Sequence, residues 1–171
     1  MITFQAFFKE KFEYDLHSNL GWLKFLEDNE DIFETDNLKE LSKWMSHIIN
    51  VHHIWNARLM NKISESEDWD LLPLAYFERF LFENYNQTIQ FLEQHSLSEK
   101  INYHDSEGVP MEKETMDILY HLLNHSNYHR AQIALKSKEL GFQIPPTNFI
   151  VFRQFTLCVN GLINPKLFLQ D

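Results

Sequence analysis

Residues 124–139 read NHSNYHRAQIALKSKE, a run rich in strong helix formers that contains neither glycine nor proline. His125 and His129 stand four positions apart in this run. Positions i and i+4 of an α-helix project from one face, with Cβ atoms about 5–6 Å apart, so two imidazoles at this spacing can bind one metal ion at about 2.0–2.1 Å each. The run therefore predicts a helix that carries part of a metal site.

The rest of the site has to come from another helix. His121 extends the series, but His121 and His129 lie roughly 12 Å apart along a helix axis, so one ion cannot bind all three. A helical wheel places His125 and His129 in the arc that should face the core, together with the apolar residues Ile118, Leu122, Ile133 and Leu140. Buried imidazoles need partners, because unpaired polar groups inside a protein cost several kcal/mol.

Length and composition are typical of one aromatic-rich domain spanning residues 1–171. The chain has 15 Phe, 4 Trp and 6 Tyr but only 4 Gly, and its formal net charge is −10. This acidity disfavours nucleic acids and anionic membranes as partners, since phosphate binding relies on Lys and Arg. With a single cysteine, Cys158, no apolar run near ~20 residues and no signal-peptide pattern, we expect a soluble cytoplasmic protein.

The apolar residues recur at three- and four-residue steps in four long segments. Pro73 suits a first helical turn, and Gly141 with Pro145 and Pro146 should end the last helix. The pattern breaks between residues 96 and 114, where residues 105–110 indicate a turn in an irregular or short hairpin connection. The sequence thus predicts an all-α four-helix bundle with a short C-terminal helix, the helices covering residues 3–28, 36–61, 72–94, 114–140 and 147–159. Ligand sites in such bundles are built from inward-pointing side chains on facing helices.

The second predicted helix offers three candidates for the third ligand, His47, His52 and His53. The helical wheel points His53 away from the apolar arc and puts His47 and His52 at its opposite edges, with His52 slightly closer to the core direction. Periodicity therefore leaves both open. Three neutral histidines with one open position form a common arrangement for a catalytic divalent ion.

Two segments resemble the DinB/YfiT-like family. Residues 41–59, LSKWMSHIINVHHIWNARL, are similar to its second helix, and residues 123–133, LNHSNYHRAQI, to its Asn-His-x-x-Tyr-His-Arg-Gly-Gln motif. Together with residues 141–152 and the helix order, the resemblance covers most of the chain. It implies a four-helix bundle, often dimeric, whose divalent metal binds His47, His125 and His129. His52 and His121 then become structural or near-site residues.

The resemblance also implies an activity. Characterised relatives include transferases and isomerases that use a low-molecular-weight thiol, and others have been viewed as metal-dependent hydrolases. We therefore expect a small-molecule substrate, a homodimer, and a divalent ion for which zinc, nickel and iron are all chemically suitable. The alternative is a non-catalytic metal-binding stress-response protein, since the family name comes from damage-inducible expression.

The remaining motif residues are expected to be structural. Trp55, Arg58, Tyr128 and Arg130 match the family pattern, but tryptophans in bundles usually belong to the core and arginines usually pair with carboxylates. The chain departs from the pattern at two positions, with Ala131 in place of Gly and Asn148 in place of Asp. It has no glycine-rich phosphate loop, CxxC or GxSxG motif, so the sequence names no catalytic residue beyond the predicted metal ligands.

Overall fold

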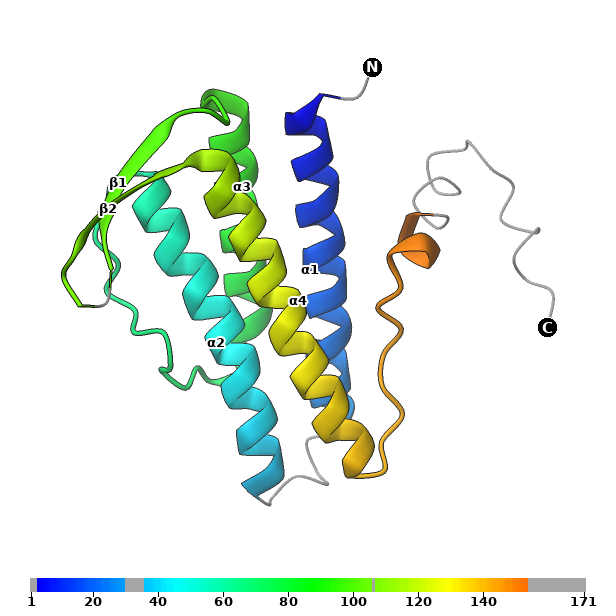
Figure 1. The fold of residues 1–171 in the computed structure, drawn as a ribbon. Helices are drawn as coiled ribbons and strands as arrows, with labels where there is room; N and C mark the ends of the chain where they lie inside the picture. Colours follow the sequence, from blue (N-terminus) through cyan, green and yellow to red (C-terminus); the bar gives the residue numbers. More distant parts are fainter. Residues whose placement is uncertain (1–2, 30–35, 106, 154–171) are drawn as a thin grey trace.

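Four helices lie side by side, and a two-stranded hairpin lies beside one end of α2 (Figure 1). The computed structural model describes residues 3–29, 36–105 and 107–153. The predicted four-helix bundle is confirmed. Its elements are α1 (Phe4–Asp28), α2 (Asp36–Leu59), the 3₁₀ turn η2 (Leu74–Tyr76), α3 (Phe77–Gln94), β1 (Lys100–His104), β2 (Pro110–Glu114) and α4 (Thr115–Glu139).

The helices bury the apolar faces that their spacing predicts. α2 packs mainly against α4, and α1 packs mainly against α3. Some apolar side chains of the helices stay exposed: Phe4, in the first turn of α1, is 69% exposed, and Phe82 on α3 is 41% exposed, whereas its neighbour Leu81 is buried in the core. The core forms two clusters, one around Trp22, Leu26, Leu41, Met45, Ile49 and Phe77, and the other around Phe8, Phe12, Phe91, Leu92, Leu119 and Leu122.

The third helix starts later than its sequence predicts. Pro73 has an extended backbone (φ −62°, ψ 135°) and precedes η2, so α3 begins only at Phe77. Two hydrogen bonds explain the difference, because they hold the preceding connection extended along α2. The Asn50 side chain donates to the Asp70 carbonyl (2.8 Å), and the Leu72 N–H donates to the Ser46 hydroxyl (3.1 Å).

The connection before α4 is a hairpin, the second of the two forms that we considered. β1 and β2 pair antiparallel in the register Lys100↔Glu114 to His104↔Pro110. α4 ends at Glu139, one residue before the predicted end, and the predicted stop at Gly141 has a φ of +85°, which lets Phe142 N–H donate to the Ser137 carbonyl (3.0 Å).

The chain then returns along α1 (Figure 1), where the Tyr14 hydroxyl donates to the Thr147 carbonyl. Residues 149–153 are helical, and the rest of the predicted fifth helix, with Cys158, lies outside the described residues. No helix among the described residues is long and apolar enough to cross a lipid bilayer.

Candidate metal centre

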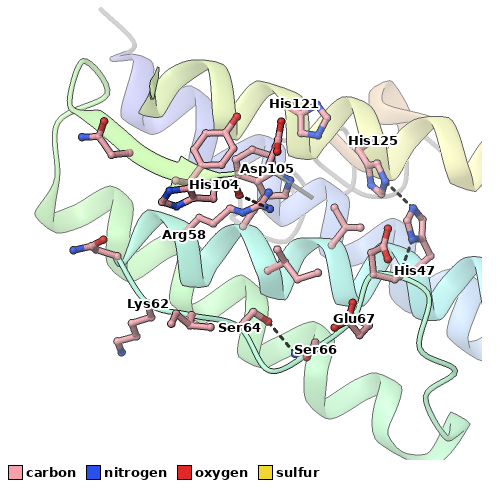
Figure 2. Close-up of a pocket in the computed structure, with 18 residues that line it drawn as sticks. His47, Arg58, Lys62, Ser64, Ser66, Glu67, His104, Asp105, His121 and His125 are labelled. Carbon is pink, nitrogen blue, oxygen red and sulfur yellow. Dashed lines mark hydrogen bonds between the residues drawn. The ribbon is translucent and has the colours of Figure 1, made fainter. Parts of the chain in front are cut away.

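Three histidines from two facing helices converge on one point. His47 comes from α2, and His125 and His129 come from successive turns of α4; one ring nitrogen from each lies within 4.8 Å of the others. The Nε2 atoms of His47 and His125 are 3.0 Å apart, and Figure 2 shows the two rings pointing toward each other between the helices. In the part of the chain that the structure describes, no other group of histidine, cysteine or acidic side chains has this geometry.

The outer nitrogens of two rings are held by the protein. His47 Nδ1 lies 2.8 Å from the Asp68 carbonyl oxygen, which can only accept, so this nitrogen carries the proton. His129 Nδ1 lies 2.8 Å from Gln132 Oε1, which also accepts. Both rings therefore present an unprotonated Nε2 to the cluster. This arrangement is typical of metal-binding histidines, whose second nitrogen donates to a carbonyl or carboxylate.

The surroundings keep the three imidazoles neutral. Burial lowers the pKa of His47 and of His129 from the usual 6.5. Burial, reinforced by the neighbouring charges of His129 and His47, lowers the pKa of His125 to about 3. Trp69 adds to the desolvation, since it stacks on the His47 ring with centroids 3.7 Å apart and planes 9° apart. Neutral imidazole is the form that binds a metal.

The donor set fits a divalent cation. Ligand nitrogens around one tetrahedral ion, each at about 2.0–2.1 Å, stand roughly 3.3 Å from one another, close to the separation of the His47 and His125 nitrogens. In the alternative without an ion, the same two nitrogens share one hydrogen bond and His129 Nε2 keeps an unused lone pair. Three convergent imidazoles are thus better satisfied by a cation than by each other.

The structure separates the other candidate histidines from the cluster. His52, which the wheel placed slightly closer to the core, instead contacts the Thr88 hydroxyl on α3 (2.8 Å) and packs against Phe12. His53 is partly buried outside the cluster. His121 lies one turn before His125, with ring centroids 6.0 Å apart, and it lines the neighbouring cavity.

A cavity of about 730 Å³ reaches the cluster at His47 and His125. Its walls come from α2, the connection over residues 61–68, the hairpin and the start of α4. Figure 2 shows the histidines at one end of this space and Arg58, His104 and Asp105 at the other. A small molecule in the cavity would therefore lie directly against two of the three candidate ligands.

Sequence reasoning missed the residues that support the histidines. Trp69 and the Asp68 carbonyl lie in an irregular connection, where no periodic pattern marks them. Gln132 carried a usable signal, because side chains at i and i+3 on a helix are neighbours and it stands three positions after His129.

The residues expected to be structural divide into two groups. Arg130 pairs with Asp15 in the core, and Tyr128 is 62% exposed. Trp55 and Arg58, by contrast, line the cavity.

The two departures from the family motif lie away from the cluster. Ala131 is exposed on α4, and Asn148 Oδ1 accepts the Ile150 N–H (2.9 Å) at the start of the last helical turn. Neither belongs to the histidine cluster or lines the cavity.

Of the comparisons with known proteins, the scan against protein families gave a match. No curated protein and no solved structure matched the chain. A protein-family model matches residues 9–164, which include α1 from Lys9 onward, the whole of α2, α3 and α4, and the three convergent histidines. On this match the chain belongs to the DinB family.

Proposed function

We propose that the protein is a divalent-metal-dependent enzyme that transfers a low-molecular-weight thiol to an electrophile, with His47, His125 and His129 as metal ligands. The observation that carries the proposal is the open cavity beside a neutral three-histidine cluster. A structural metal site is usually closed by a fourth protein ligand, whereas a catalytic site keeps a position free for substrate.

The chemistry follows from the charge of the ligand set. With neutral ligands from His47, His125 and His129, a bound divalent cation would keep its full charge and would lower the pKa of a thiol or water at the site, so that a nucleophile would exist at neutral pH. The protein's own contribution is positional. The Asp68 carbonyl and Gln132 fix the orientation of the His47 and His129 rings, and Trp69 excludes water from one face of His47.

The reaction can be tested with an activated aryl halide as electrophile. The thiol sulfur would form the new bond to carbon, the halide would leave with its electron pair, and the thiol proton would pass to solvent. We expect the rate to follow metal occupancy when the protein is loaded with zinc, nickel or iron, and to fall to the uncatalysed level in His125→Ala. His53→Ala removes a histidine outside the cluster and should behave like the wild type.

Hydrolysis is the competing reaction at the same site. If the cluster activates water, a nitrophenyl ester should be cleaved without any thiol, with a rate that rises through a pKa near 7. The choice of the thiol route rests on the family resemblance rather than on the geometry. Equal rates for the wild type and His125→Ala with both substrates would contradict catalysis and support the non-catalytic metal-binding alternative.

A homodimer belongs to the same proposal. The resemblance supports it, and so do large apolar side chains on the surface, among them Phe4, Phe7 and Phe82. Light scattering at micromolar concentration should give twice the chain mass. A value near 20.6 kDa would contradict it.

A further inference from the structure

Within the part of the chain that the structure describes, one arginine lacks the carboxylate partner that the other three have. The sequence contains four arginines. Arg79 pairs with Glu83 (2.7 Å), Arg153 pairs with Glu10 (3.2 Å), and Arg130 pairs with the buried Asp15. Among the described residues, no carboxylate lies within 4.0 Å of Arg58, although acidic side chains outnumber basic ones 25 to 15 in the sequence. Arg58 is also the one that lines the cavity.

The Arg58 side chain is nevertheless held in place. Its guanidinium carbon lies 4.6 Å from the Trp55 ring centroid and 5.0 Å from that of Tyr103. One N–H donates to the His104 carbonyl at 3.3 Å, and Figure 2 shows the side chain reaching from α2 to the hairpin. A guanidinium has five N–H donors, so most of them are left for a ligand in the cavity.

Of the three acidic residues that line the cavity, Glu67 lies toward the His47 end (Figure 2), and Asp105 is engaged in the hairpin turn. Asp105 Oδ1 accepts the N–H groups of Glu107 and Val109, both at 2.9 Å, which ties this carboxylate to the hairpin turn. Lys62 adds a second positive charge to the wall. Asp68 belongs to the histidine end, where its carbonyl accepts from the His47 ring.

A continuous wall joins Arg58 to the histidine cluster. From His125 the rings of His121, Trp55 and Tyr103 follow one another with centroid separations of 6.0, 5.4 and 5.0 Å. Arg58 stands eleven residues after His47 on α2, roughly 16 Å along the helix axis. An elongated molecule with its reactive atom at the histidines would therefore extend along aromatic rings toward the guanidinium.

We propose that Arg58 binds a carboxylate at the far end of the substrate, so that the substrate class is an acid rather than a neutral thiol. The planar guanidinium fork matches a carboxylate with two parallel hydrogen bonds, and its aromatic supports pre-organise it. The statement about substrate rests on the proposed function, but the anion site itself can be tested without metal or thiol.

Calorimetric titration of the metal-free protein with octanoate and octanamide tests the anion site. We expect the wild type to bind octanoate about tenfold more tightly than octanamide, as a charge-assisted hydrogen-bonded pair predicts. Arg58→Gln should remove this preference while leaving octanamide binding unchanged. Arg79→Gln, the same charge loss outside the cavity wall, should keep it.

Two further variants test whether the guanidinium geometry and the neighbouring charge of Asp105 contribute to the preference for octanoate. Arg58→Lys keeps the charge but loses the fork, and should retain only part of the preference. Asp105→Asn keeps the oxygen that the turn needs and removes a nearby negative charge, so it should strengthen octanoate binding. A wild type without preference for octanoate, or an Arg58→Gln variant that retains it, would overturn the proposal.

A final titration separates this inference from the proposed function. Mercaptooctanoate should bind the zinc-loaded wild type more tightly than octanoate does, because its thiol reaches the histidine end. If the thiol adds nothing while Arg58 still selects for octanoate, the thiol route fails and the anion site stands.

Discussion

His129 and Arg130 are neighbours on α4, yet His129 meets a histidine of α2 and Arg130 meets polar side chains of α1. His129 joins His47 and His125 beside the cavity. Arg130 faces α1, where its guanidinium donates to Asp15 and to Asn19 (2.9 Å), and it also donates to Ser126 on α4 itself (2.6 Å). Asp15 and Arg130 are each only 4% exposed.

The two clusters differ in how their polar atoms are satisfied. In the Arg130 cluster a buried charge meets its countercharge, and the neighbouring amide and hydroxyl add further hydrogen bonds within the protein. In the histidine cluster each ring is neutral, His47 and His129 each bind a carbonyl oxygen of the protein through Nδ1, and their Nε2 atoms meet only other imidazoles. Burial serves the fold in the first case, and it keeps lone pairs available for a cation in the second.

The largest expected effect is the loss of stability when the Arg130 cluster is broken. Asp15→Ala leaves the Arg130 charge buried without a partner, and it should lower the free energy of unfolding by about 3–5 kcal/mol. Urea denaturation followed by circular dichroism measures this loss. Glu13→Ala removes an exposed carboxylate from the same helix and should change stability by less than about 0.5 kcal/mol. Similar losses in both variants would contradict the distinction.

Substitutions in the histidine cluster should change metal affinity rather than stability. His125→Ala and His129→Ala should each lower metal affinity by more than about 100-fold, beyond what the loss of a supporting residue costs, with little change in the stability of the metal-free protein. Elemental analysis of purified variants, with about one ion per wild-type chain, checks this expectation. Unchanged metal content in both variants would remove the site. If His52→Ala abolishes binding and His47→Ala does not, the assignment of the third ligand is wrong.

The two clusters also differ in how much of each could be predicted from the sequence. His125 and His129 were found because a helix fixes the distance between positions i and i+4. The cluster around Arg130 carries a comparable signal on α1. Asp15 and Asn19 continue the three- and four-residue spacing of the buried Phe8, Phe12 and Trp22, so polar residues occupy core positions and must find polar partners there.

Other features had no local signal. The wheel could not separate His47 from His52, because both lie at the edges of the apolar arc, and tertiary packing against α3 decides the outcome through Thr88. The late start of α3 depends on side chains of α2 that hold the preceding connection, and the cavity exists only once the hairpin meets α2 and α4. Long-range contacts of this kind leave no periodic trace in the sequence.

A smaller effect should come from the support of one ligand. Gln132→Ala removes the acceptor that fixes the His129 ring, and metal affinity should fall about tenfold, the lower end of the usual range because water can partly replace a half-buried amide. Competition with a chromogenic chelator measures the change. Lys138→Ala, an exposed position on the same helix, is the control. Equal affinity in the wild type and Gln132→Ala would show that ring orientation is set by packing alone.

The smallest expected effect concerns His52, which lies on α2 like the candidate ligand His47 but outside the histidine cluster. Burial lowers the pKa of His52 from 6.5 to about 4, with the Asp15 charge opposing the shift. The unfolded chain therefore binds more protons than the folded one between these values, so stability is complete above about pH 6.5 and is lost progressively as the pH falls to about 4. At pH 5 full burial would cost about 2 kcal/mol, and the partial exposure of the ring reduces this to about 1 kcal/mol.

His52→Gln retains a donor for Thr88 but does not titrate. In metal-free protein the free energy of unfolding of this variant should therefore fall by about 1 kcal/mol less than that of the wild type between pH 7 and pH 5. Urea unfolding at the two pH values checks the difference, and parallel losses in the two proteins would mean that His52 is protonated as readily in the folded chain as in the unfolded one.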